Sequence, residues 1–117
     1  MPTPPFIYKK VAELSVSAGS EWTVEQCKFQ ADRDYVIEKI HIIEKSGRAL
    51  HATMVTIRVD QDYLTEDKVP ASIFAPDDVY SPTLNWELPA GKTFYCAGSN
   101  GEGVDINIVV VLKLKPK

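Results

Sequence analysis

The sequence predicts an all-β protein, an antiparallel β-sandwich of two sheets built from eight strands. Three observations support this prediction. Apolar residues recur at every second position in most segments, turn-forming residues separate the segments at roughly ten-residue intervals, and no segment has convincing helical periodicity. At 117 residues the chain is large enough for one domain with a single core.

The clearest predicted strand covers residues 104–115, which read VDINIVVVLKLK. Strict alternation over this length is typical of a strand, because successive side chains point to opposite faces. One face is polar at both ends but apolar at Val109 and Val111, which indicates a central strand whose second face is partly covered. The opposite face is expected to enter the core with Val104, Ile106, Ile108, Val110, Leu112 and Leu114.

The first half of the chain predicts four further strands, over residues 11–17, 22–30, 35–43 and 51–60. In the second of these the period shifts between Trp22 and Cys27, which predicts a β-bulge near Glu25 and Gln26. Residues 35–43 are apolar on both faces, and their β-branched residues favour an interior strand over the competing helix.

The second half predicts shorter strands over residues 71–74, 83–88 and 93–97. Trp86 shares its phase with Leu84 and Leu88, so we expect it in the core. The Asn100-Gly101 pair predicts a hairpin turn before the last strand, because both residues tolerate a positive φ.

At the N-terminus, residues 1–7 are expected to form an extended arm, because Pro2, Pro4 and Pro5 keep it unpaired. Residues 8–117 then form the single domain. Phe6, Ile7 and Tyr8 make an apolar cluster at the end of the arm, which can either cover an edge of this domain or reach a neighbouring subunit.

The eight predicted strands fit a single jelly roll, with 11–17, 104–115, 35–43 and 83–88 in one sheet and the other four in the second. In length, strand pattern and lack of catalytic motifs the chain resembles the small single jelly-roll structural proteins of virus and phage particles. The resemblance implies a non-enzymatic protein of the virion, such as a capsid, decoration or spike-base protein, that assembles with itself and with other virion proteins.

Composition and motifs argue against several other functions. A net charge of −3 disfavours nucleic-acid binding, and no apolar run is long enough for a signal peptide or a membrane span, so a non-viral protein of this kind would be soluble. A cupin-type metal centre requires a His-x-His pair, whereas His41 and His51 are ten residues apart. No nucleophile motif is present, and we expect no enzyme activity and no cofactor.

Two smaller features are weighed against simpler interpretations. Asp60, Asp62, Glu66 and Asp67 could hold Ca²⁺, but they lack the spacing of an EF-hand loop, and a solvated acidic loop is favoured. Cys27 and Cys96 are expected at similar depths on paired strands. Two free buried thiols are favoured there over a disulfide.

Two surfaces remain as candidate sites. The first is an interface for self-association, with a trimer as our expectation, formed by Phe6, Ile7, Tyr8, Val109 and Val111. The alternative is a carbohydrate- or receptor-binding module, in which Tyr63 and Tyr80 offer exposed aromatic rings to a glycan.

Overall fold

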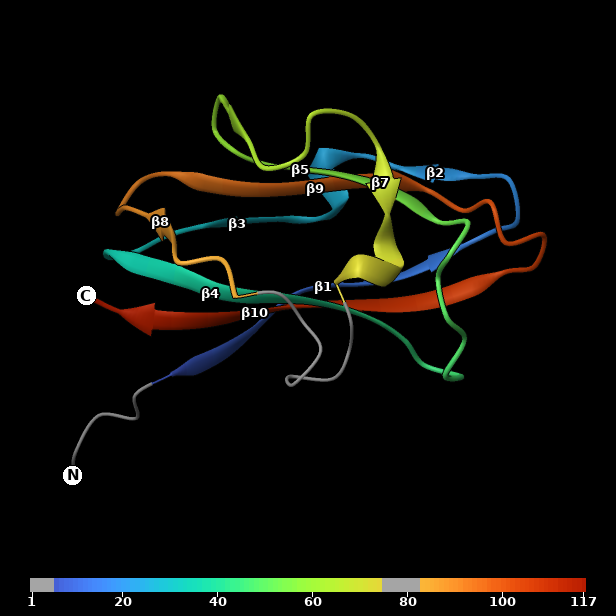
Figure 1. Ribbon diagram of the computed structural model, residues 1–117, viewed down its shortest axis with the longest axis horizontal. Coiled ribbons are helices and arrows are strands. Elements are labelled where there is room, and N and C mark those ends of the chain that lie inside the picture. Colours follow the sequence, from blue (N-terminus) through green and yellow to red (C-terminus); the bar gives the residue numbers. More distant parts are fainter. Residues whose placement is uncertain (1–5, 75–82) are drawn as a thin grey trace.

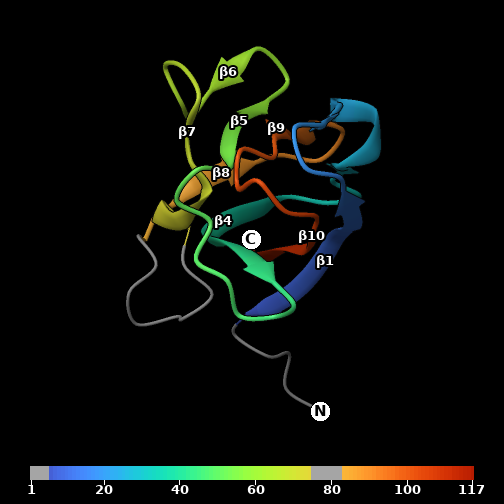
Figure 2. The same ribbon diagram turned by 90° about the vertical axis from the view of Figure 1, so that its right-hand side faces the viewer.

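Two antiparallel β-sheets pack face to face in the computed structural model, which describes residues 6–74 and 83–117 (Figures 1 and 2). The first sheet has the strand order β1-β10-β4-β8. The second has the order β2-β9-β5-β6, with β3 also paired to β9 and β7 also paired to β5. The prediction of an all-β sandwich of two antiparallel sheets is confirmed.

The first sheet contains the longest strands: β1 (Ile7–Val16), β4 (Tyr35–Glu44), β8 (Trp86–Leu88) and β10 (Ile106–Pro116). The second sheet is built from shorter pieces: β2 (Glu21–Trp22), β3 (Lys28–Gln30), β5 (Met54–Val59), β6 (Asp62–Tyr63), β7 (Val69–Pro70) and β9 (Thr93–Ser99). Two single-turn 3-10 helices interrupt it, η1 (Val24–Gln26) and η2 (Ala71–Ile73).

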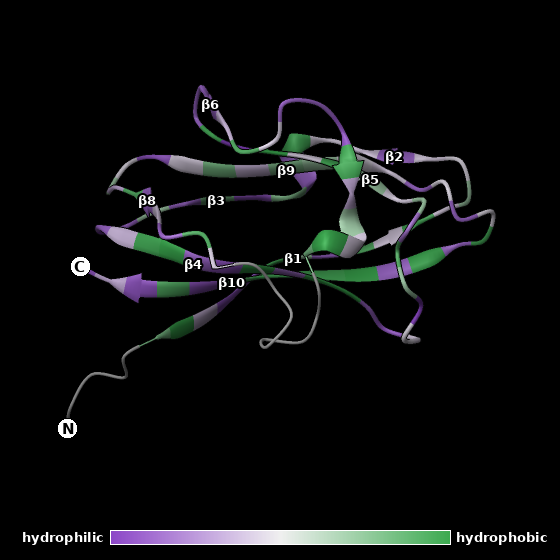
Figure 3. Cartoon of the chain, viewed as in Figure 1, coloured by the Kyte–Doolittle hydropathy of each residue, from purple (hydrophilic) through white to green (hydrophobic). Residues whose placement is uncertain are grey.

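Strand β10 runs through the middle of the first sheet, between β1 and β4 (Figure 1). Its alternate residues from Ile106 to Leu114 are buried, as the sequence pattern predicts. In Figure 3 the middle of β10 is a continuous hydrophobic run, because the residues between the core positions are also apolar there. The strand begins two residues later than predicted, and Val104 is exposed (42%) instead of entering the core.

The late start of β10 follows from the turn that precedes it. The buried Asn100 side chain donates hydrogen bonds to the carbonyl oxygens of Val16 (3.0 Å) and Val104 (2.7 Å), and it accepts one from the Glu102 N–H. The Asp105 carboxylate accepts a further bond from the Ala18 N–H. These bonds hold residues 100–105 as an ordered turn and attach it to the end of β1, at Val16 and Ala18.

Residues 22–30 do not form one bulged strand. The 3-10 turn η1 separates β2 from β3, and Gln26 caps the turn by accepting the Thr23 N–H. The turn shifts the alternation of inward- and outward-facing residues, as a bulge would have done, so Trp22 and Cys27 are both buried. The Trp22 indole N–H donates to the Cys96 carbonyl oxygen at 3.0 Å.

Other boundaries also differ from the predictions, and β8 begins at Trp86 although the predicted strand began at residue 83. Residues 71–74 form the η2 turn and its end, and the strand next to β5 is instead β7, just before it. Pro70 cannot donate to a ladder, which limits β7 to two residues at the sheet edge. Strand β5 begins at Met54, and β1 begins at Ile7, inside the predicted arm. Residues 1–5 lie outside the described residues.

The core lies between the sheets and is continuous. Its largest fully buried residues are Phe94, Ile37, Ile40, Ile57, Leu88, Ile106, Ile108, Leu112 and Leu114. Gly98 is required where β2 meets β9, because an added Cβ would lie 2.5 Å from the Trp22 ring. Trp86, expected in the core, is half-buried and packs against it.

Candidate functional site

The outer face of the first sheet brings the predicted interface residues Val109 and Val111 together with residues of both neighbouring strands. Val109 lies opposite Glu13 of β1 and Ile43 of β4. Residues directly opposite in an antiparallel pair point to the same face. On this face, Glu13, Val109 and Ile43 therefore lie side by side across the three strands. Lys10, Val111 and His41 form a second row of the same kind.

Apolar groups occupy the middle of this outer face. Val109, Val111 and Ile43 are half-buried, and His41, opposite Val111, is only 4% exposed. Charged groups surround them: Lys10 lies opposite Val111, and the Glu13 carboxylate pairs with the Lys45 ammonium at 2.6 Å. The Lys45 hydrogen bond and charge lower the pKa of Glu13. This face therefore combines three half-buried apolar side chains with charged neighbours, a composition found at protein contacts.

The aromatic residues at the start of β1 extend this outer face. The Lys113 ammonium lies 4.4 Å from the centroid of the Phe6 ring and 5.9 Å from that of Tyr8. Lys113 is opposite Tyr8 in the ladder and is only 8% exposed, whereas Tyr8 is 59% exposed. The two rings thus lie on the same side of the sheet as Val109 and Val111. Ile7 is opposite Leu114 and packs against the core.

The outer face of the second sheet carries a row of alternating cations and rings that the sequence analysis did not identify. The ladder places Tyr95 of β9 between Lys28 and Arg58, and Arg58 between Tyr95 and Tyr63. The Arg58 guanidinium carbon lies 4.2 Å from the centroid of the Tyr95 ring. Tyr63 is 61% exposed, and Tyr80, its predicted companion, lies outside the described residues.

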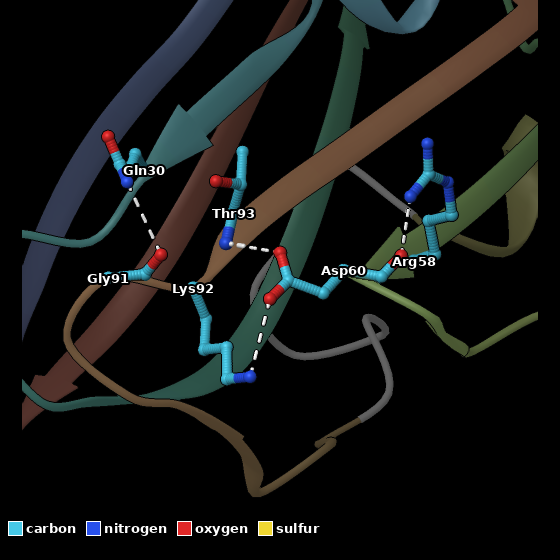
Figure 4. A network of polar contacts seen from close by, with 6 residues as sticks. All are labelled: Gln30, Arg58, Asp60, Gly91, Lys92 and Thr93. Atoms are coloured by element: carbon cyan, nitrogen blue, oxygen red, sulfur yellow. Dashed lines mark hydrogen bonds and ion pairs between the residues drawn. The ribbon is translucent and has the colours of Figure 1, made fainter.

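The Asp60 carboxylate is used within the fold (Figure 4). It accepts the Thr93 N–H at 3.1 Å and pairs with the Lys92 ammonium at 3.5 Å, while the Asp60 carbonyl accepts a bond from Arg58. Asp60 has a φ of 48°, a turn conformation that Asp tolerates. Among the described residues no group of three His, Cys, Asp or Glu side chains is placed to hold a metal ion, so the acidic loop does not gather into a cation site.

The two cysteines lie side by side, as predicted. The Cys96 N–H donates to the Cys27 carbonyl oxygen at 3.0 Å, one step along from the Lys28–Tyr95 pair of the ladder. Both thiols are free and fully buried. The adjacent Cys27 thiol and burial raise the pKa of Cys96 well above its ordinary value, which makes it a poor nucleophile.

One pairing of nucleophile and base comes from the fold and not from the sequence. The His51 Nδ1 and the Ser72 Oγ lie 3.2 Å apart, although the residues are 21 positions apart in the chain. Hydrolysis by such a pair ordinarily needs a third group that orients the imidazole. In the described segments, no carboxylate hydrogen-bonds to His51, and the contact serves to join the β4–β5 loop to η2.

Comparison with known proteins does not assign the chain to a family. No family model, no curated protein and no solved structure matches it. Within residues 6–74 and 83–117, no helix is long and apolar enough to cross a membrane. The two sheet faces and the chemistry of their residues are therefore the features from which a function can be inferred.

Proposed function

We propose that this chain is a non-enzymatic jelly-roll protein that assembles with itself as a building block of a particle, a virion component being the example it most resembles. The strand orders support the jelly-roll assignment. In both sheets the order of adjacent strands is the one expected for that topology, with β10 between β1 and β4 and β9 between β3 and β5. A fold alone carries no function, so the proposal depends on a surface.

The observation that carries the proposal is the apolar centre of the outer face of the first sheet. Val109, Val111 and Ile43 come from two adjacent strands whose inner faces already fill the core. Because these three side chains face outward, the packing of the interior does not require them to be apolar. Contiguous apolar surface on a small domain marks a contact with another molecule. A closed symmetric assembly buries this surface on every subunit, and we propose a trimer.

Variants of the outer face test the proposal. In Val109→Lys/Val111→Lys, two charges would have to be buried in the contact, so we expect the assembly to dissociate to monomers in light scattering after size exclusion. Val109→Thr/Val111→Thr keeps the β-branched shape, so this variant should fold normally and should weaken assembly to a smaller degree. Thr56→Lys, a half-buried site on the opposite sheet, is the control. An unchanged mass in both double variants contradicts the proposal.

A second candidate function is supported by the cation and ring row on the other sheet. We propose, as the alternative, a carbohydrate-binding surface at Tyr63, Arg58 and Tyr95. Aromatic rings stack on the apolar faces of sugar rings, and the stacked guanidinium of Arg58 can pair with an acidic sugar. Beside the row is a shallow hollow of about 100 Å³ lined by Thr56, Ala97, Lys68, Glu21, Trp22 and Gly98.

A glycan array that includes uronic and sialic acids tests this alternative. Tyr63→Ala should abolish any hit, whereas Tyr8→Ala, which removes an equally exposed tyrosine from the other sheet, should leave it unchanged. An array without hits, or equal losses in the two variants, contradicts carbohydrate binding at this row. Neither result changes the outcome expected for self-association.

A further inference from the structure

A pocket lies at one end of the sandwich, away from both sheet faces described above. It opens between the loop that joins β4 to β5 and the η2 turn, and it has a volume of about 250 Å³. Its floor is apolar, formed by Ile42, Leu50 and Phe74, each at most 3% exposed. Its mouth is formed by exposed residues of the loop, among them Arg48, Ala49 and His51.

Hydrogen bonds hold the walls of the pocket in place. The Ile42 N–H donates to the Phe74 carbonyl oxygen at 3.1 Å, and the contact between His51 and Ser72 joins the loop to η2 at 3.2 Å. The other end of the loop is fixed where the Ala52 N–H donates to the Glu102 carboxylate at 2.7 Å. A pocket with preformed walls loses little conformational entropy when it binds a ligand.

The two charged groups at the pocket differ in how they are engaged. The Glu44 carboxylate accepts bonds from the N–H groups of Ser46 (2.7 Å) and Asn107 (3.0 Å) and from the Ser46 hydroxyl. Within the described part of the chain, the Arg48 guanidinium forms no ion pair and its side chain donates no hydrogen bond. The cation at the mouth is therefore available to a ligand, whereas the carboxylate is used by the loop.

We propose that this pocket binds a small amphipathic carboxylate, whose hydrocarbon part lies on the Ile42, Leu50 and Phe74 floor and whose head group pairs with Arg48. Volume supports the hydrocarbon part: an apolar cavity of about 150 Å³ suffices for benzene, so 250 Å³ accommodates a short alkyl chain. Charge supports the head group, because guanidinium matches carboxylate with paired hydrogen bonds. The exposed His51 ring lies beside the same opening.

Titration with sodium octanoate, followed by amide NMR, tests the proposal. We expect shifts confined to residues 42–51 and 72–74, and an affinity that rises about fourfold per methylene from hexanoate to octanoate. Arg48→Gln should weaken octanoate binding about tenfold and leave octanol binding unchanged, because only the charge-assisted bond is lost. Arg33→Gln is the matched control, since Arg33 stacks on Tyr35 away from the pocket.

A second variant tests the apolar part of the pocket without changing the cation that would bind the carboxylate head group. Ala49→Trp places a large ring at the exposed mouth and should abolish binding of octanoate and octanol alike while the spectrum remains that of a folded protein. Equal octanoate affinity in the wild type and Arg48→Gln, shifts outside the pocket, or no shifts at millimolar octanoate would overturn the proposal. Light scattering on both variants should give the wild-type mass, which separates this site from the self-association surface.

Discussion

Glu44 is predicted to be one of the main sources of pH-dependent stability in this protein. It is 7% exposed, and its carboxylate accepts bonds from Ser46 and from the backbone of Asn107. The hydrogen bond from Ser46 is the largest cause that lowers the pKa of Glu44 from 4.5 to about 2. The substitution Glu44→Gln removes the charge and keeps the size of the side chain.

The magnitude follows from linkage between protonation and folding. A shift of one pKa unit corresponds to 1.36 kcal/mol, so the ionised Glu44 contributes on the order of 3 kcal/mol to the free energy of unfolding. Because the pKa is lowered in the folded state, this contribution is complete above the unfolded pKa of 4.5. It is lost as the pH falls from 4.5 through about 2.

Urea unfolding of the wild type and Glu44→Gln at a series of pH values measures this effect. Glu44→Gln should be less stable by about 2–3 kcal/mol at pH 7, and the difference should shrink to a few tenths of a kcal/mol near pH 2, where about half of the wild-type Glu44 carboxyls are protonated in the folded state. Glu13→Gln, at an exposed ion pair with Lys45, is the control and should change stability much less. A difference that is small at pH 7, or that stays constant down to pH 2, would refute the reasoning.

Three further predictions concern the core and the turns. Gly98→Ala should lower the free energy of unfolding by about 2 kcal/mol or more, because the new Cβ would meet the Trp22 ring and the Met54 carbonyl oxygen. The control is Gly103→Ala, whose Cβ has no neighbour within 4 Å and which should cost only the strain of its positive φ. Equal losses of stability in thermal melts would contradict the packing argument. Cys27 and Cys96 should not react with Ellman's reagent in the native protein and should both react in guanidinium, and rapid native labelling would show that they are accessible. Asp60→Ala should destabilise the β5–β6 turn by about 1 kcal/mol, while Asp60→Asn keeps an acceptor for the Thr93 N–H and should cost less; equal losses would mean that the bond is unimportant.

Alternation along the strands was sufficient to predict the sandwich, because a period of two fixes which residues face the core once a segment is extended. It also placed Val109 and Val111 on the outer face, whereas the proximity of Cys27 and Cys96 was expected from the jelly-roll pairing of their strands. Alternation gave wrong boundaries where hydrogen bonds from polar side chains determine the backbone conformation. Asn100 holds the turn before β10, which keeps Val104 out of the core, and the Gln26 cap makes a 3-10 turn where a bulge was expected.

The candidate sites were predicted less completely, because they depend on which strands pair and in what register. Tyr63 was identified as an exposed aromatic residue, but its row with Arg58 and Tyr95 appears only when β6, β5 and β9 are aligned. The sequence signal for this row is the alternation of Thr56 and Arg58 with the apolar residues Val55, Ile57 and Val59, which predicts that Arg58 faces outward. The contact between His51 and Ser72 joins a loop to a turn, and no periodicity predicts it.

The most direct test of the account is the mass of the wild-type protein in solution, measured by light scattering after size exclusion over a range of concentrations. We predict a discrete assembly, about three times the mass of the 13.0 kDa chain for the proposed trimer. The mass should fall to that of one chain in Val109→Lys/Val111→Lys. A wild-type protein that remains a monomer of 13.0 kDa at every concentration would contradict self-association through the outer face of the first sheet.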